Sequence, residues 1–381
     1  MSIVSEIPGG AGVLARIEGA CVSGLTAQAL LEAVAEHLPR AVPMDGIFTA
    51  ATDPDTMLTI GAGLAHGMPD SVCGPYWEHE IEIPDYNKFT DLARGPQHVA
   101  DLHTATGGRP ERSARWRMFR EHTDFDAELR AAFTANDRGW GILQINREGT
   151  HGRFTESEVA FVDLVASQVG RALRTSLLTR ATDRFDGRGP GMIVLDRDYR
   201  IVSANDEAWS WFTEIPRHES LCNGLADERL PNEVLHAAQV ESMRGSRPDL
   251  PQAPTRTRVR THGGGWLAIH ASCLTDGNGD TGLIAVVVEP ANASDMAPLM
   301  IEAYELTARE LDVTRALARG LPTNEIAQTL HLSRYTVQDH LKRIYEKVGV
   351  SSRGELIAKV YADHYHERLD AAIERAEVRI A

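Results

Sequence analysis

The sequence predicts a protein of several domains, in which two mixed α+β domains are followed by an all-α domain of four helices. A chain of 381 residues is too long for one hydrophobic core of ordinary size. Over the first 300 residues, short apolar runs with the alternation of strands lie among helical patterns, whereas the later residues show helical spacing alone. A turn-rich segment at 182–191 divides the first part. We therefore expect domains at residues 1–180, 188–292 and 300–370.

The overall composition is that of an ordinary folded protein, 43% hydrophobic and 24% charged. The first residues have neither the basic start nor the apolar stretch of a secretory signal. The longest apolar run, residues 283–288, is far shorter than the roughly 20 residues that cross a bilayer. We expect a cytoplasmic protein without a membrane segment, and we assign this run to a buried strand.

The four cysteines, Cys21, Cys73, Cys222 and Cys273, are scattered along the chain. Their spacing fits neither a zinc knuckle nor a disulfide framework, so a reducing compartment is expected. Free cysteine is often buried as a small apolar side chain. We expect that structural role for each of the four.

The distribution of charge is more informative than its total. A net charge of −15 argues against a nucleic-acid partner, because phosphates attract lysine and arginine. However, residues 301–365 hold nine basic and nine acidic side chains, while residues 1–300 hold 27 basic and 41 acidic ones. The acidity lies almost wholly in the part that need not touch DNA.

The C-terminal part begins with a well-marked helix. The Thr307 side chain can accept a hydrogen bond from the backbone amide of Glu310, and the Glu310 side chain can accept one from the amide of Thr307. This reciprocal pair is a capping box. Leu311, Leu317 and Ala318 supply apolar positions, and a left-handed Gly320 is expected to end the helix.

Two further helices follow at once. Thr323 is expected to cap a short helix over residues 324–330, and Ser333 a longer one that ends at Gly349. The longer helix has apolar residues at helical spacing, namely Val337, Leu341, Ile344 and Val348. The pattern is a helix, a tight turn and a longer helix, which leaves the outer face of the longer helix free to enter a major groove.

Polar side chains on and beside that outer face are the candidate DNA contacts. Gln338 can pair bidentately with adenine, while Lys342 and Arg343 can neutralise backbone phosphates. The plain alternative is a solvated helix face with an ordinary Asp339–Arg343 pair. Three capped helices in this order favour the DNA-binding interpretation. The predicted DNA-binding residues are Thr323, Arg334, Tyr335, Thr336, Gln338, Asp339, Lys342 and Arg343.

These residues resemble the LuxR-type helix-turn-helix from end to end. The resemblance covers about 60 residues and is carried by Leu306-Thr307, Arg309-Glu310, Gly320-Leu321, Asn324-Glu325-Ile326-Ala327, Leu332-Ser333, Thr336-Val337, His340-Leu341 and Lys347-Val348-Gly349-Val350. It implies a transcription regulator that binds double-stranded DNA, with a reading helix after Ser333. It also implies a further helix at about 352–369 that helps to form a homodimer.

The chain departs from that pattern at two positions. Gln338 stands where the family often has lysine or arginine, and His331 where glycine is frequent. A left-handed residue with a side chain is strained by roughly 1 kcal/mol. The segment 335–342 also resembles an actinobacterial sub-group of these regulators, which makes the glutamine less unusual.

The two preceding domains resemble sensor folds. The first of them is similar to a GAF domain. The similarity is carried by a helix near 26–38, strands near 45–51, 57–62 and 140–146, and a long helix that begins with a Thr155–Glu158 capping box. Strands at 192–196 and 200–205, with Asn205 before a short helix, resemble the start of a PAS domain. Later strands are expected at 255–261, 266–274 and 281–289, and a proline-rich irregular stretch between 231 and 254.

Both resemblances imply a pocket for a small-molecule effector. Conceivable pocket residues are Cys73, Tyr76, Trp77, His79 and Trp140, although such residues are more often part of a core. A helical zinc site is not expected at His79, Glu80 and Glu82, because the second histidine of such a site is missing. We predict a solvated acidic segment there. No metal and no cofactor are expected.

Catalysis is not predicted for any part of the chain. Gly263, Gly264 and Gly265 are not followed by the lysine of a phosphate-binding loop and are expected to turn a hairpin before Trp266. The residue pattern of a phosphoacceptor domain is also missing. Two alternatives stay open. One is a sigma-like promoter factor, which shares the opening Leu-Thr-x-Arg-Glu. The other is a signalling enzyme that uses the GAF-like half.

Overall fold

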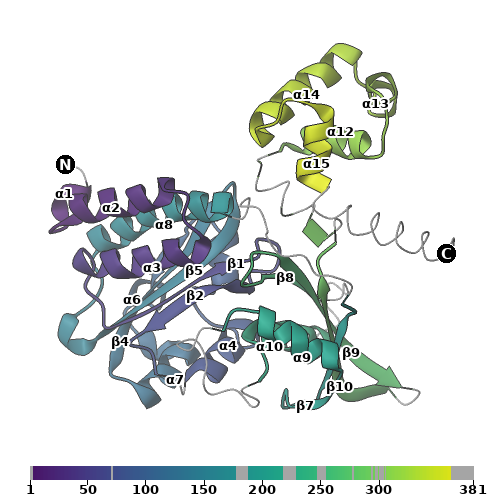
Figure 1. Ribbon diagram of the computed structural model, residues 1–381. Helices are drawn as coiled ribbons and strands as arrows, with labels where there is room; N and C mark the ends of the chain where they lie inside the picture. The colour runs from purple at the N-terminus through teal and green to yellow at the C-terminus, as the bar shows by residue number, and fades with distance from the viewer. Residues whose placement is uncertain are drawn as a thin grey trace. The chain divides into compact units, whose positions relative to one another are not determined.

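The structure is a computed structural model that describes residues 3–69, 72–176, 188–217, 229–246, 255–276, 279–292, 295–296, 299, 304 and 306–361. The chain divides into two compact units, Met1–Pro290 and Ala291–Ala381. The first unit contains two sheet domains, and the second contains a helical domain (Figure 1). The predicted fold class, two α+β domains followed by an all-α domain, is confirmed. The predicted domain limits stay predictions, and most of the linker at 182–191 lies outside the described residues.

The first domain is built on a five-stranded antiparallel sheet in the order β2-β1-β5-β4-β3. The central strand β5 pairs with β1 on one side and β4 on the other, and nine of its eleven residues are buried. The strands are β1 (Gly46–Thr52), β2 (Thr59–His66), β3 (Val99–Asp101), β4 (Phe125–Ala135) and β5 (Arg138–Glu148).

Helices cover both faces of this sheet (Figure 1). One face packs against α3 (Ala27–His37) and α8 (Glu156–Ser176), and α2 (Gly10–Val22) packs on these two helices. The other packs against α4 (Cys73–Ile81), α5 (Phe89–Arg94) and α7 (Ala114–His122) around an aromatic cluster. Shorter helical segments are α1 (Ile3–Glu6), η1 (Leu38–Arg40), α6 (Leu102–Ala105), η3 (Pro110–Arg112) and η4 (Gly149–His151).

The strongest local signals of the first domain are confirmed. Thr155 and Glu158 make the predicted reciprocal hydrogen bonds at the start of α8, whose buried face includes Val162, Val169 and Leu173. The sequence pattern missed β4, because charged Glu128 and Arg130 interrupt its apolar residues. Both side chains are buried and form ion pairs, so the tertiary structure accommodates charged residues inside a buried strand.

The second domain repeats the same sheet order, β7-β6-β10-β9-β8. Its strands are β6 (Gly191–Leu195), β7 (Ile201–Ala204), β8 (Thr255–Arg260), β9 (Trp266–Asp276) and β10 (Gly279–Pro290). Helices α9 (Asp206–Glu214) and α10 (Asn232–Ser246) pack on one face of the sheet around one apolar core. The turn between β8 and β9 contains Gly264 at φ 89°, which confirms the predicted glycine hairpin.

Two expectations for this domain are wrong. The stretch expected to be irregular contains α10, with Val234 and Ala237 fully buried, because a helical apolar pattern lies between the prolines. The run at 283–288 is a strand but not a buried one. Ile284, Val286 and Val288 face the core and are buried, while the residues between them are half-buried, since the helices cover only one face.

The helical domain contains α12 (Ala308–Ala318), α13 (Thr323–Thr329), α14 (Arg334–Val348) and α15 (Arg353–Tyr361). The capping box at Thr307 is present, and the left-handed Gly320 and Gly349 follow α12 and α14 as predicted. Thr323 was expected to cap α13, and this is wrong. Pro322 takes the cap position without a side-chain hydrogen bond, and Thr323 is the first residue of the helix.

Cys21 and Cys273 are free and half-buried, so they are less enclosed than expected. Cys222 and the side chain of Cys73 lie outside the described residues. Within the described ranges, no helix is long and apolar enough to span a membrane.

Candidate functional site

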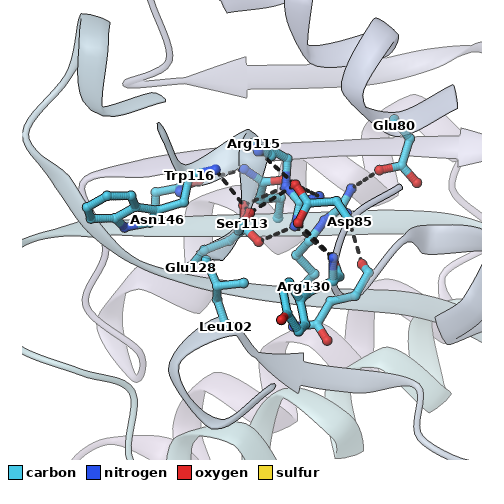
Figure 2. A network of polar contacts seen from close by, with 12 residues as sticks. Glu80, Asp85, Leu102, Ser113, Arg115, Trp116, Glu128, Arg130 and Asn146 are labelled. Atoms are coloured by element: carbon cyan, nitrogen blue, oxygen red, sulfur yellow. Dashed lines mark hydrogen bonds and ion pairs between the residues drawn. The ribbon is translucent and has the colours of Figure 1, made fainter. Parts of the chain in front are cut away.

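A buried polar network lies between the first sheet and helices α4 and α7 (Figure 2). Arg130 of β4 donates from Nη2 to Glu80 Oε2 at 2.7 Å and from Nη1 to the carbonyl oxygen of Asn87 at 2.9 Å. Its guanidinium carbon is 3.6 Å from the ring centre of Phe89. The same Nη2 also reaches the hydroxyl of Tyr76. A fully buried cation is thus enclosed by one carboxylate, two rings and a carbonyl.

A second buried arginine extends this network (Figure 2). Arg115 donates twice to Glu128, at 2.9 and 2.6 Å, and its backbone amide donates to Asp85. Burial opposes the charge of Arg115, but Glu128, Glu80 and Asp85 together raise its pKa. The three carboxylates therefore stabilise the charged guanidinium inside the domain.

The expectation of a solvated acidic segment is wrong at Glu80. Glu80 is 8% exposed, because Arg130 of β4 and the amide of Phe89 both bind its carboxylate. The spacing of α4 turns Glu80 toward the sheet while Glu78 stays exposed. No sequence signal links residue 80 to residue 130, which is 50 positions away.

Three of the conceivable pocket residues, Tyr76, Trp77 and Trp140, are buried. Tyr76 and Trp77 are buried with their rings 5.5 Å apart, edge to face. Trp140 is buried and donates to the carbonyl of Ala135 at 3.1 Å. His79 is half-buried, and burial lowers its pKa. Within the described residues, no cluster of histidine, cysteine and acidic side chains with the make-up of a metal site is present.

The two sheet domains contact each other through polar groups that the sequence did not predict. Arg258 of β8 binds Asp53 of the first domain with both Nε and Nη2, at 2.6 and 2.9 Å, and both side chains are buried. His236 of α10 lies over Trp77 with a 4.0 Å centroid distance. Burial lowers the pKa of His236 to about 3, so the ring is neutral.

The helical domain presents one helix with a buried and an exposed side. Val337, Leu341, Ile344 and Val348 of α14 are buried against the domain. On the other side, six of the eight predicted DNA-binding residues are exposed, and Thr323 and Thr336 are half-buried. Tyr335 is 80% exposed. The exposed six are Arg334, Tyr335, Gln338, Asp339, Lys342 and Arg343.

The cations on this exposed side are available to a partner. In the described part of the helical domain, Arg334, Lys342 and Arg343 make no ion pair, and the Asp339–Arg343 pair of the plain alternative does not form. A solvated lysine or arginine is the group that replaces counterions along a phosphate backbone. The geometry therefore suits an extended polyanion.

Side-chain contacts join α12 to both α14 and the end of α13. Lys347 donates to Glu310 at 2.7 Å, so the residue that closes the α12 capping box also anchors α14. Arg309 donates to the carbonyl of Leu330 at 2.7 Å, at the end of α13. His331 follows with φ 52°, so the left-handed backbone expected at this non-glycine position is present.

Comparison with known families agrees with this geometry. Residues 304–360 match the family model of bacterial regulatory proteins, luxR family. This segment is a luxR-family helix-turn-helix domain.

Two curated relatives match a short part of the chain. The chain is 47% identical over 53 residues to the probable transcriptional regulatory protein SgaR of Hyphomicrobium methylovorum. The matched segment is 14% of this chain and 25% of SgaR. It is 46% identical over 48 residues to the nitrate/nitrite response regulator NarP of Escherichia coli, 13% of this chain and 22% of NarP. The chain spans about a quarter of the length of these relatives.

Solved structures resemble the chain more distantly. A GAF domain from an Acinetobacter phosphoenolpyruvate-protein phosphotransferase has 12% identity and a TM-score of 0.31, covering 45% of this chain and 97% of that one. The VqmA–ligand–DNA complex of Vibrio cholera has 18% identity and a TM-score of 0.24, covering 48% and 86%. At these scores the likeness does not extend to function.

The Glu310 side chain gives a stability prediction for the luxR-family domain. Burial acts to raise its pKa, but hydrogen bonds from Lys347 and Thr307 outweigh this and lower it. Glu310→Gln is expected to lower the free energy of unfolding of the domain by about 1–2 kcal/mol at neutral pH. A lowered pKa stabilises the fold above the unfolded-state pKa, and this stabilisation is lost as the pH falls through the folded-state value.

The measurement is urea unfolding followed by circular dichroism at pH 7 and at pH 3. The difference between wild type and variant should shrink at pH 3, and Glu346→Gln, an exposed residue of α14, should behave as wild type. A difference that is equal at both pH values would contradict the role of the charge.

Proposed function

We propose that the chain is a transcription regulator that binds double-stranded DNA in a sequence-specific way through the exposed side of α14. The observation that carries this proposal is the exposed cationic and amide side chains on that face, whose cations make no ion pair among the described residues of this luxR-family domain. In a helix-turn-helix such a helix lies in the major groove. Gln338 then reads a base edge, while Lys342 and Arg343 contact phosphates.

The protein acts as a homodimer in this proposal. Two copies present their reading helices about one helical turn apart, roughly 34 Å, and select a near-palindromic site. We place the protein in the cytoplasm with its DNA, and we assign the control of DNA binding to a small-molecule signal that the two sheet domains receive. No catalytic step and no resident cofactor form part of the proposal.

The competing functions fit the fold less well. A sigma-like factor would need an aromatic-rich helical domain upstream for strand opening, whereas the described residues of the first unit form two sheet domains. A signalling enzyme would need a reactive group. In the first domain the buried carboxylates Glu80 and Glu128 are bound to Arg130 and Arg115. Turnover assays with cyclic nucleotides on the full chain test this alternative, and we expect none.

Selection of genomic DNA fragments by the purified full chain tests the proposed function directly. We expect a recurring near-palindromic sequence, bound with an affinity that falls steeply as the salt concentration rises. Recovery of fragments without a shared sequence would exclude sequence-specific regulation.

Two substitutions on α14 separate phosphate contact from base reading. Lys342→Ala is expected to weaken binding to every sequence and to reduce the slope of log affinity against log salt by about 1. Gln338→Ala is expected to cost about 1–3 kcal/mol on the selected site and little on mismatched sites. Fluorescence anisotropy at several salt concentrations measures both effects. Arg315→Ala, an exposed cation of α12, is the control, and unchanged binding by both α14 variants would show that another face touches DNA.

A further inference from the structure

A cavity of about 490 Å³ lies where the two sheet domains meet. One wall is the start of α3 and strand β2, and the other is the segment after α9 together with the β8–β9 hairpin. Small-molecule sites in proteins commonly have volumes of roughly 300–1,000 Å³ and often form at domain junctions. The cavity is therefore large enough for a metabolite and lies at the boundary between two domains.

Three basic side chains line this cavity, namely Arg217, Arg260 and His262. Arg217 and His262 are exposed and come from the second domain. Arg260 is half-buried, donates to the carbonyl oxygens of Gly264 and Ser176, and lies over the ring of Trp266. These contacts fix the guanidinium in place, and burial lowers its pKa. A cation held in a partly enclosed site attracts a negative ligand more strongly than one in open water.

The opposite wall adds no negative charge. The described lining contains no aspartate or glutamate, and α3 turns its N-terminal end toward the cavity at Thr26 and Ala27. An acidic residue does lie nearby. Glu233 is bound to Thr59 and Gly61, and burial raises its pKa to about 7 although these hydrogen bonds act to lower it. Much of its charge is therefore suppressed at neutral pH, and it opposes an anion only weakly.

The shape of the wall limits the kind of anion. Gly263 and Gly264 lack side chains, so a ligand can approach the hairpin backbone closely. Ile60, Ala62 and Pro216 form an apolar part of the wall beside the cations. Two guanidinium groups match the double charge of a phosphate monoester better than the single charge of a carboxylate. The apolar part suits the organic body of the ligand rather than inorganic phosphate.

We propose that this junction cavity binds a small organic phosphate, with Arg217 and Arg260 on its phosphate group. The site touches both sheet domains, so its occupant would change how firmly they are held together. This inference deepens the proposed function by naming the chemical class of the signal. Its test contains no DNA, so the binding of the phosphate and the binding of DNA can fail independently.

The test is isothermal titration calorimetry of the full chain with adenosine monophosphate, glucose 6-phosphate, inorganic phosphate and benzoate at low salt. We expect at least one of the two esters to bind, and to bind more tightly than inorganic phosphate or benzoate. Arg217→Gln and His262→Asp should each weaken that binding about tenfold or more. The first removes a positive charge from the cavity wall, and the second adds a negative charge that repels the phosphate. Both residues are exposed, so the variants are expected to fold.

Two controls keep the result specific to the cavity. Arg200→Gln removes a 63% exposed arginine elsewhere in the second domain, and Lys342→Ala removes a cation from the face proposed to bind DNA. Neither should alter ester binding. The proposal is overturned if neither ester binds at about 10 mM, a range beyond ordinary metabolite affinities. It is equally overturned if benzoate binds best, if Arg217→Gln and His262→Asp bind as wild type, or if Lys342→Ala alone abolishes binding.

Discussion

Replacing Glu80 by glutamine is expected to lower the free energy of unfolding of the first unit by about 3–5 kcal/mol, because a buried cation then loses its countercharge. Arg130 is fully buried, and its Nε has no hydrogen-bond partner among the described residues. Glutamine keeps an oxygen for the amide of Phe89 and has nearly the same shape. The variant therefore isolates the charge. Urea unfolding followed by tryptophan fluorescence measures the effect.

Two comparisons give this prediction its meaning. Glu78→Gln changes an exposed acid on the same helix and should stay within about 0.5 kcal/mol of wild type. Glu80→Leu combined with Arg130→Met removes both charges and should be more stable than Glu80→Gln. If Glu80→Gln unfolds like Glu78→Gln, the network does not contribute as its geometry indicates.

Gly170→Ala is expected to destabilise the first unit by about 2 kcal/mol, although alanine is the better helix former. The added methyl group would lie 2.6 Å from the backbone nitrogen of Thr134 and closer still to its carbonyl oxygen. Gly170 is where α8 approaches β4, and backbone atoms cannot move aside as a flexible side chain can. Overpacking therefore outweighs helix propensity at this position.

The matched control is Gly19→Ala in α2, where nothing lies within 4 Å of the added methyl group. That variant should gain up to about 1 kcal/mol, because propensity acts there without a clash. Thermal unfolding of the three proteins should give the highest melting temperature for Gly19→Ala, an intermediate one for wild type and the lowest for Gly170→Ala. The reverse order would mean that the α8–β4 packing is looser than the structure shows.

The helix boundaries on either side of the predicted DNA face depend on local information, and most of them could be predicted for that reason. Four helix-start or helix-end signals involve only neighbouring residues, and all four are present. They are the Thr307–Glu310 capping box, Gly320, Ser333 and Gly349. Thr323 failed as a cap because Pro322 precedes it and takes that position. The anchor from Lys347 to Glu310 was not predicted, since it joins residues 37 positions apart.

The sequence by itself determined the order of the domains, the start and end signals of α12 and α14 in the luxR-family domain and the polar composition of the exposed side of α14. These follow from hydrophobic period and from caps, which act between near neighbours. Only the tertiary structure decided that Glu80 is buried against Arg130, that Arg258 binds Asp53, and that a basic cavity forms between two domains. The physical reason is that burial and charge pairing depend on which distant segments meet, and strand pairing and helix packing set those meetings.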